Sequence, residues 1–414
     1  MRLEAEIRER YDVLVAGGGV AGVFAAICAA RLGAKTLLVE KDSMLGGTAT
    51  LGGVDFPGIF HAWGRQIISG PCWESIERAE KLGGATVPPV VYRPEHHWDM
   101  QVRVDGFVYE WVLEDMCRQA GVDVRLHTML AHARETGEGI EAALCGREGL
   151  YGVWARTAVD ATGDGEMAAM LGCRMEKTDP LQPGTLMNRI GGYDLHTVRR
   201  EDVERAFEGL DLQGASPWHM LKTGRVNMHM PVTEAHTSRG RSQMEMDARH
   251  MLMDIVRRMR GIEGLEHVKV TWAAPSFGVR EGRRIVGRHR ITEEEYYRGE
   301  KYPDSVCHSF YPIDLHVPGS IDIRPLPEGV VPCIPYRALL PVSGARRVAA
   351  AGRCISGDPL AASAFRVQAS CMATGQAAGT AAALCAGQGI PLDDLSITEL
   401  RRALSSLRCV VPEE

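Results

Sequence analysis

The hydrophobic residues near the start of the chain follow a strand–helix–strand pattern. Residues 13–15 form a short apolar run typical of a buried strand, and residues 20–32 are mainly apolar over a length typical of a helix. A second apolar run at residues 36–39 ends at the acidic Glu40. This order predicts a β-α-β unit, the building block of a parallel α/β sheet.

Three glycines, Gly17, Gly19 and Gly22, occupy the turn between the first strand and the helix with the spacing G-x-G-x-x-G. Gly17 permits a tight turn, Gly19 lets a pyrophosphate approach the backbone, and Gly22 lets the helix pack close to the strand. The N-terminus of the helix offers N–H groups and a partial positive charge to phosphates. Glu40 can accept hydrogen bonds from a ribose. The unit therefore predicts a dinucleotide site, with NAD and FAD both open at this point.

Strand and helix patterns continue in two further parts of the chain. Each predicted strand ends at a short turn, and a helix pattern follows that turn. The strand at residues 348–351 needs the earlier strands as neighbours to bury both of its faces, so we expect the two parts to share one sheet. The other segments are a helix at 107–121, a strand pair at 122–135, a strand that ends at Ala161-Thr162-Gly163, and a long helix of small residues from about 365 to 386.

The pattern changes in the middle of the chain. Residues 200–210 and 242–261 have the periodicity of amphipathic helices, and the methionines of the second helix fit a hydrophobic core better than a cofactor site. Residues 302–341 hold eight of the 21 prolines, which predicts extended segments and turns. We expect these extended segments to form a wall or lid over a substrate.

The length of 414 residues exceeds what one hydrophobic core usually supports, so we expect two closely joined domains. The fold class that we predict is α/β, with a doubly wound, Rossmann-like domain that binds the dinucleotide. This domain is placed at residues 1–172 and 338–414. An inserted α+β substrate domain is placed at residues 173–337.

Charge and composition argue against several classes of protein. The net charge of −6 disfavours nucleic acid as a partner. No stretch approaches the ~18 apolar residues of a membrane span, and the charged start, MRLEAEIRER, lacks the apolar core of a signal peptide. The 11 cysteines include no C-x-x-C pair, which argues against a zinc ribbon and predicts reduced thiols in the cytoplasm.

Several longer motifs follow one another along the chain. They are the glycine turn through Glu40, Gly46-Gly47-Thr48-Ala49-Thr50, Ala161-Thr162-Gly163-Asp164-Gly165, residues 280–287, residues 310–316, and Gly352-Arg353-Cys354-Ile355-Ser356. Together they resemble the FAD-dependent oxidoreductase family of the glutathione-reductase-like flavoprotein superfamily. The resemblance spans about residues 11–386 and implies FAD as the cofactor. The residues that we expect to bind FAD are Gly17, Gly19, Val20, Ala21, Gly22, Glu40, Lys41, Gly46, Gly47, Thr48, Ala49, Thr50, Leu130, Ala161, Thr162, Gly163, Gly352, Arg353, Val367 and Gln368.

The source of electrons follows from what the chain lacks. There is no second G-x-G-x-x-G between a predicted strand and helix to receive NADPH, and no redox pair of cysteines. Electrons therefore pass between FAD and a small organic substrate. The resemblance also directs the N-terminus of the long helix at the flavin, where its partial positive charge would stabilise the anionic reduced form. The small residues of this helix permit close backbone approach to a sheet or a flat ring.

The best candidate for a general base is the pair Asp314 and His316. In an extended strand, residues two apart project to the same face, so the carboxylate could orient the imidazole. Such a base would accept the proton of a hydroxyl group during oxidation. A salt contact at a strand edge is the alternative interpretation.

Other polar groups have two interpretations each. Arg280 and Arg283 belong to an arginine cluster that suits either carboxylate recognition or an ion-pair network with neighbouring acids. His61 follows the predicted flavin loop and either contacts substrate or is structural. Cys354 fits a small buried residue better than a reactive thiol. No metal site is predicted, since the histidines 96 and 97 lack partners at ligand spacing.

We expect an enzyme that transfers a hydride between a small polar substrate and N5 of FAD. The substrate would be an alcohol, a hydroxy acid or a sugar-like molecule, and an unidentified acceptor would take the electrons. One alternative is reduction of an activated C=C bond, as in fumarate-reductase-type flavoproteins, with arginines that clamp a carboxylate and donate a proton. Another is an electron-transfer subunit, which the lack of Cys₄ iron–sulfur spacing disfavours. Assembly into a homo-oligomer stays open.

Overall fold

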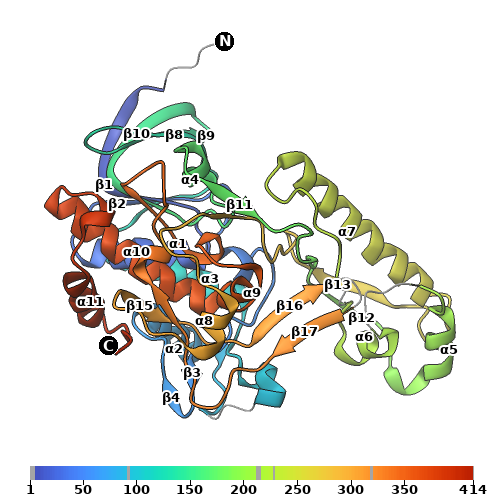
Figure 1. The fold of residues 1–414 in the computed structure, drawn as a ribbon. Coiled ribbons are helices and arrows are strands. Elements are labelled where there is room, and N and C mark those ends of the chain that lie inside the picture. The colour runs from blue at the N-terminus through green and yellow to red at the C-terminus, as the bar shows by residue number, and fades with distance from the viewer. Residues whose placement is uncertain (1–4, 91–93, 211–215, 227–228, 318–319, 414) are drawn as a thin grey trace.

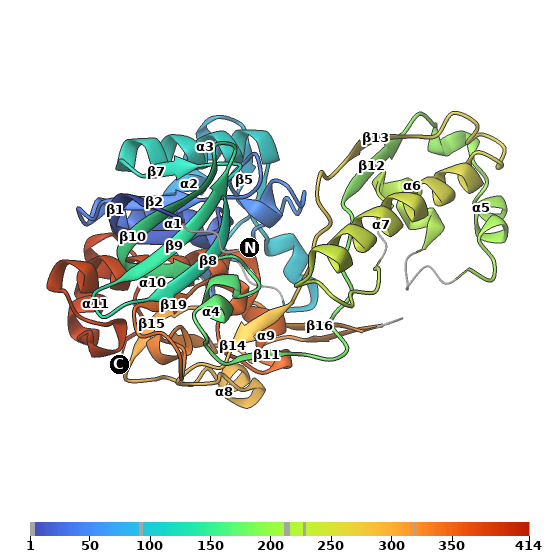
Figure 2. The ribbon, with the colours of Figure 1, turned by 90° about the horizontal axis from the view of Figure 1, so that it is seen from above.

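The computed structural model describes residues 5–90, 94–210, 216–226, 229–317 and 320–413. Its centre is a seven-stranded sheet with the order β7-β2-β1-β10-β9-β8, in which β19 also pairs with β10 (Figures 1 and 2). Strands β7, β2, β1, β10 and β19 are parallel, and β8 and β9 extend the sheet in antiparallel fashion. The strands are β1 (Ile7–Ala16), β2 (Thr36–Val39), β7 (Asp123–Arg125), β8 (Met129–Glu135), β9 (Ile140–Gly146), β10 (Gly149–Asp160) and β19 (Val348–Ala350).

This sheet confirms the predicted Rossmann-like α/β fold, because β19 pairs with the same strand that pairs with β1. Strand β10 has a double role, since its first half pairs with β9 and its last three residues pair with β19. Residues 13–16 of β1 and all of β2 and β19 are buried and are mainly apolar, as expected for central parallel strands. The helices of this part are α1 (Val20–Arg31), α2 (Pro71–Lys81), α3 (Gly106–Ala120), α4 (Glu166–Met170), α9 (Pro359–Phe365), α10 (Gln368–Gln388) and α11 (Ile397–Ser406).

The glycines of α10 allow it to lie directly on α1. A side-chain carbon at Gly375 would sit 2.1 Å from the carbonyl oxygen of Ala21, and one at Gly379 would sit 2.0 Å from that of Ala25. The small residues of α10 therefore serve a helix–helix contact with α1, in addition to the predicted approach to the sheet, where the hydroxyl of Thr157 in β10 donates to the carbonyl of Ala382 at 2.9 Å. The helix also begins later than predicted, at Gln368 after a break at Arg366, because α9 ends at Phe365.

A second hydrophobic cluster lies beside the sheet domain and is built from residues between 181 and 279 (Figure 2). Residues between 285 and 340 join the larger cluster of the sheet domain instead. The predicted division at residues 172 and 337 stays a prediction. The elements of the smaller cluster are β12 (Asn188–Gly191), α5 (Arg200–Ala206), α6 (Pro217–Thr223), α7 (Ser238–Met259) and β13 (Lys269–Ala273).

The proline-rich segment is extended, as predicted, and forms two short antiparallel pairs, β15 with β18 and β16 with β17. Strand β16 packs against α9, next to the start of α10. No helix in the described part of the chain is long and apolar enough to cross a membrane. The remaining elements are β3 (His61–Ala62), β4 (Arg65–Gln66), β5 (Ala85–Thr86), β6 (Arg103–Val104), β11 (Met175–Lys177), β14 (Arg283–Ile285), α8 (Glu293–Arg298), β15 (Ser305–His308), β16 (Ile313–Val317), β17 (Ser320–Arg324) and β18 (Cys333–Pro335).

Candidate functional site

The carboxyl ends of the central parallel strands meet at one edge of the sheet. Ala16, at the end of β1, pairs with Val39 of β2 and with Asp160 of β10, and Asp160 pairs with Ala350 of β19. The loops that follow these strands carry most of the predicted cofactor residues. Ligands of open parallel sheets bind outside this edge, so the topology brings the separate motifs to one place.

Each glycine of the first turn has a distinct environment. Gly17 has φ of 99°, and a side-chain carbon there would lie 2.5 Å from the carbonyl oxygen of Ala161. A side-chain carbon at Gly22 would lie 1.8 Å from the carbonyl oxygen of Gly17. Gly19 differs, because among the described residues no atom beyond its chain neighbours lies within 4 Å of the place where its side chain would start. Gly17 and Gly22 are therefore required by packing, whereas Gly19 leaves open space at the N-terminus of α1.

That open space has an anion-binding character. Gly19 is the N-cap of α1, and no side chain caps the N–H groups of the first turn. Val20 and Ala21, which begin the helix, are buried. Uncapped N–H groups and the helix dipole favour a negatively charged group such as a pyrophosphate.

The second glycine loop lies against the first. The N–H of Gly46 donates to the carbonyl of Gly18 at 2.8 Å, and a side-chain carbon at Gly47 would be 3.0 Å from Cα of Gly19. Gly47, Thr48 and Ala49 form one turn of 3₁₀ helix. The hydroxyl of Thr50 closes the loop by donating to the carbonyl of Leu45 at 2.5 Å. The loop thus lines a second side of the open space.

Glu40 is buried at the end of β2 and is held by backbone N–H groups. Its Oε2 accepts from Gly18 at 2.6 Å and its Oε1 accepts from Asp42 at 2.9 Å. Each carboxylate oxygen keeps a lone pair for a further donor such as a ribose hydroxyl. Lys41 is exposed and pairs with Asp42, and Leu130 is buried in β8.

The loops after β10 and β19 are joined by a buried aspartate. Asp164 pairs with Arg353 at 3.1 Å and with Arg241 of α7 at 2.9 Å. Burial alone would raise the pKa of Asp164, but the charges of Arg353 and Arg241 lower it. Gly163 has φ of 84° and lies against the guanidinium of Arg353. The cofactor edge is therefore tied to the smaller cluster through Arg241.

A second polar site lies where α9, α10 and β16 meet. Nε2 of His316 lies 3.2 Å from Oδ2 of Asp314, and both side chains project from the same face of β16, as predicted. Arg366, between α9 and α10, donates to the backbone carbonyl of Asp314 at 3.2 Å. Its guanidinium is 3.7 Å from the carboxylate of Asp314. The side chain of Gln182 accepts from the N–H of His316 at 3.2 Å.

Arg280 adds a second guanidinium to this site. It donates to the carbonyl of Pro183 at 2.5 Å and contacts Nε2 of His229 at 3.3 Å. The ring of His229 packs edge-on against that of His316, with 4.7 Å between centroids. Within the described residues, no carboxylate lies within 4.0 Å of Arg280. We call Asp314, His316, Arg280, Arg366, Gln182 and His229 the polar site.

The charges of the polar site do not balance. Burial alone would raise the pKa of Asp314, but the hydrogen bond with His316 and the charges of Arg366 and Arg280 hold it near 2. Burial lowers the pKa of His316, and burial with the charge of Arg280 lowers that of His229 to about 4. Burial and the charge of Arg366 lower the pKa of Arg280 to about 9. At neutral pH the site therefore carries two positive charges and one negative charge.

Several buried polar atoms of this region have no hydrogen-bond partner within the described residues. They include Nδ1 of His316, Nε2 of Gln182, Nε of Arg366 and Oε1 of Gln368. Gln368 begins α10, and its amide donates to the carbonyl of Val54 at 2.9 Å, just after the second glycine loop. Buried polar groups are normally satisfied, so these atoms mark a place for a ligand beside the cofactor edge.

The comparison with known families decides the class of this site. The model of the family described as FAD dependent oxidoreductase matches residues 12–404. This chain belongs to the FAD-dependent oxidoreductase family. It is an enzyme with FAD as its cofactor, and the open space at Gly19 with its uncapped helix fits the pyrophosphate of that cofactor. The wider assignment to the glutathione-reductase-like superfamily stays a prediction.

Individual relatives add less. Dihydrolipoyl dehydrogenase of Trypanosoma brucei brucei is 51% identical over 78 residues, which are 19% of this chain and 16% of that protein. The structure of AlpK has a TM-score of 0.48 at 16% identity, over 91% of this chain and 62% of AlpK. The p-nitrophenol 4-monooxygenase PnpA from Pseudomonas putida DLL-E4 has a TM-score of 0.49 at 12% identity, over 97% of this chain and 85% of PnpA. This chain spans less than two thirds of the first two proteins, and none of these likenesses identifies its substrate.

Some residues considered at the sequence level lie elsewhere in this oxidoreductase. The ring of His61 packs edge-on against Trp73 at 5.0 Å, and no hydrogen bond joins it to the polar site within the described residues. Arg283 lies on the side of Asp164, whose pKa its charge lowers. Cys354 is buried, and burial raises the pKa of its thiol, as expected for a small core residue. His308 contacts Cys333 at 3.6 Å in the β15–β18 pair.

The arginine cluster is divided between the two interpretations. Arg284 is buried with Glu281 at 3.2 Å, Arg288 pairs with Asp393, and Arg290 pairs with Glu176 at 3.4 Å. These three form ion pairs, whereas Arg280 faces the polar site.

Sequence reasoning missed four residues of these sites. Asp164 and Arg366 each stand directly beside a predicted residue, Gly163 and Val367, so the neighbouring motif was an available signal. Gln182 and His229 lie in segments without any motif. Only the chain fold brings these two to His316 and Arg280.

Proposed function

We propose that this FAD-dependent oxidoreductase oxidises a hydroxyl-bearing carbon of a small substrate, with His316 as the group that accepts the hydroxyl proton. FAD, when bound, supplies the hydride-accepting chemistry. The observation that carries the proposal is the buried Asp314–His316 pair next to the start of α10, in which one imidazole nitrogen has no partner within the described residues.

The protonation state of His316 follows from its neighbours. The pKa of Asp314 is near 2, so its carboxylate can only accept a hydrogen bond. Nε2 of His316 therefore carries the hydrogen, and Nδ1 of the neutral ring carries the lone pair. Because burial lowers the pKa of His316, the ring is neutral at physiological pH. Nδ1 is thus ready to accept a proton.

The charge balance points to the kind of substrate. Arg366 lies 3.7 Å from the carboxylate of Asp314, whereas Arg280 forms no ion pair within the described residues and only feels the charge of Asp314. A buried positive charge without a partner is costly, and a substrate carboxylate would supply the missing negative charge. A hydroxy acid meets both requirements, since its carboxylate would lie near the guanidinium groups and its hydroxyl near Nδ1 of His316.

A second reaction has one observation in its favour. Reduction of an activated C=C bond requires a proton donor, and the pKa of Arg280 is lowered to about 9 by burial and by Arg366. This brings a guanidinium closer to the range in which a proton can be donated. The lowered pKa of His316 favours the oxidation instead, because a neutral imidazole accepts a proton.

The test is anaerobic reduction of the FAD-loaded enzyme by a panel of hydroxy acids, neutral alcohols and sugars, followed by absorbance. Hydroxy acids should bleach the flavin, and unsaturated acids should instead re-oxidise the reduced enzyme if the alternative holds. His316→Ala should keep FAD but slow bleaching at least about a hundredfold, as expected for loss of a general base. His61→Ala is the matched control and should keep the wild-type rate.

A wild-type rate of bleaching in His316→Ala would place the base at another residue. The electron acceptor, assembly into a homo-oligomer and a cytoplasmic location stay predictions.

A further inference from the structure

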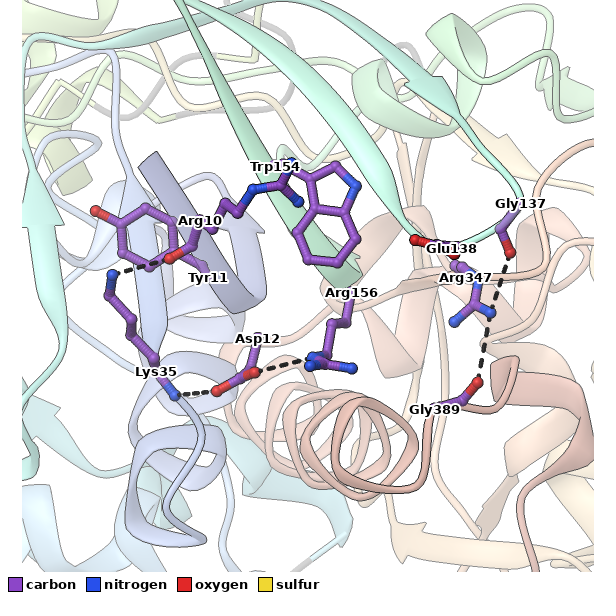
Figure 3. Close-up of a pocket in the computed structure, with 10 residues that line it drawn as sticks. All are labelled: Arg10, Tyr11, Asp12, Lys35, Gly137, Glu138, Trp154, Arg156, Arg347 and Gly389. Atoms are coloured by element: carbon purple, nitrogen blue, oxygen red, sulfur yellow. Dashed lines mark hydrogen bonds and ion pairs between the residues drawn. The ribbon is translucent and has the colours of Figure 1, made fainter. Parts of the chain in front are cut away.

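A separate groove lies at the amino ends of the parallel strands, the opposite edge of the sheet from the glycine turn. It has a volume of about 720 Å³, within the usual range for small-molecule sites. Its residues come from the first half of β1, the turn before β2, the β8–β9 turn, β10, the residue before β19 and the C-terminus of α10 (Figure 3). They are Arg10, Tyr11, Asp12, Lys35, Gly137, Glu138, Trp154, Arg156, Arg347 and Gly389.

The groove is positive although the chain is negative. Four of its residues carry a positive charge and two, Asp12 and Glu138, carry a negative one, whereas the whole chain has a net charge of −6. The excess of positive charge is therefore a local property of the groove. A local excess of this kind attracts anions.

Only one of the four positive groups has a carboxylate partner within the described residues. Nε of Arg156 lies 3.3 Å from Asp12. The guanidinium of Arg10 stacks on the ring of Trp154 at 4.8 Å, and the ammonium of Lys35 lies 4.6 Å from the ring of Tyr11. Figure 3 shows these side chains around the groove.

Arg347 is a buried positive residue of the groove. Its side chain is buried, with 9% of the residue exposed, and it has no carboxylate within 4.0 Å in the described part of the chain. It reaches the carbonyls of Gly137 and Gly389 at 3.4 and 3.5 Å, which are long for hydrogen bonds (Figure 3). The charge of Arg347 interacts with the nearby carboxylate of Glu135, but within the described residues no ion pair and no short hydrogen bond holds the guanidinium in place. Its charge is therefore compensated only in part, whereas buried charges are normally paired.

We propose that this groove binds a metabolite-sized oxyanion, a ligand that carries phosphate or carboxylate groups. The planar forks of Arg156 and Arg347 suit two oxygens of one such group, and Lys35 adds a third positive charge. The volume leaves room for more than a bare phosphate. The site is distinct from the cofactor edge and from the polar site, and it does not depend on the proposed oxidation.

The test is calorimetric titration of the FAD-loaded protein with glucose 6-phosphate, citrate and, as the neutral control, glucose. One or both anions should bind saturably and more weakly as ionic strength rises, because exposed charges are screened by salt. Glucose should not bind. Binding of glucose 6-phosphate alone would assign phosphate as the recognised group, and binding of citrate alone would assign carboxylate.

Variants locate the binding. Arg156→Gln and Lys35→Gln should each weaken it about tenfold, the loss expected for one charge-assisted hydrogen bond. Both should keep their FAD, since the cofactor lies at the other edge of the sheet. Arg147→Gln, in the exposed β9–β10 turn, is the matched control and should bind as the wild type. Failure of both anions to bind at millimolar concentration, or unchanged binding by both groove variants, would overturn the proposal.

Discussion

The cofactor edge and the polar site adjoin one another, but backbone groups form the cofactor edge and side chains form the polar site. The cofactor edge presents backbone N–H groups at the first turn of α1, and its glycines matter because they have no side chain. The polar site presents charged side chains whose pKa values depend on one another. A substitution at the cofactor edge therefore changes the shape of the binding space. A substitution in the polar site changes the charge or the protonation of the site.

The glycines also fall into two groups, those required by packing and one that leaves space for a ligand. Gly375 and Gly379 face protein backbone, and Gly19 faces open space. A side chain at the first two would separate α10 from α1 and so damage the fold. A side chain at Gly19 would damage only what binds there.

Gly379→Val should have the largest effect, on stability. Its side chain would start 2.0 Å from the carbonyl oxygen of Ala25, and two helices must move apart to admit it. We expect a loss of at least ~3 kcal/mol, the upper part of the usual range for overpacking, measured by denaturant unfolding. Gly387→Val, on the same helix but without a neighbour within 4 Å, is the control. Equal stability of the two variants would contradict the close helix contact.

Gly19→Val should leave the fold intact and abolish FAD binding. Beyond its chain neighbours, no atom of the described residues lies within 4 Å of the Cβ that valine would add, but the side chain would fill the space of the pyrophosphate. The measurements are the flavin absorbance of the purified protein, with FAD added back, and its thermal unfolding beside that of the apo wild type. A yellow Gly19→Val protein would show that the glycine turn has been misassigned.

Arg366→Lys should have an intermediate effect and tests the charge of the substrate. The charge stays, but the planar fork that can hold two carboxylate oxygens is lost. We expect KM for a hydroxy acid to rise about tenfold or more, with little change for a neutral alcohol. Arg324→Lys, in exposed β17, is the control. Equal effects on charged and neutral substrates would argue against carboxylate recognition.

Asp314→Asn should have the smallest effect and appear chiefly in the pH profile. Burial lowers the pKa of His316, while the hydrogen bond and charge of Asp314 raise it. The wild type should therefore lose activity only below the ordinary histidine value of about 6.5, and the variant should lose it at still lower pH. The measurement is the rate of flavin reduction against pH, with Asp322→Asn as control. A shift toward higher pH would contradict this role for Asp314.

The sequence by itself determined the parts that rest on local geometry. The spacing of Gly17, Gly19 and Gly22 indicates a tight backbone turn. The apolar runs of the central parallel strands indicate that both faces of the sheet are buried. The alternation in β16 was also enough to place Asp314 and His316 on one face. In each case the residues that interact are close together in the chain, or belong to strands whose ends the sheet brings together.

Only the tertiary structure decided which side chains complete the polar site. Gln182, His229, Arg280 and Arg366 come from four segments, and the pKa of His316 depends on burial that no local pattern reveals. The partner of α10 was decided in the same way, because small residues permit a close approach without specifying to what. The groove at Arg347 likewise exists only because the ends of several strands meet. Contacts and electrostatic interactions depend on distance in space. For residues far apart in the sequence, that distance is set only when the chain has folded.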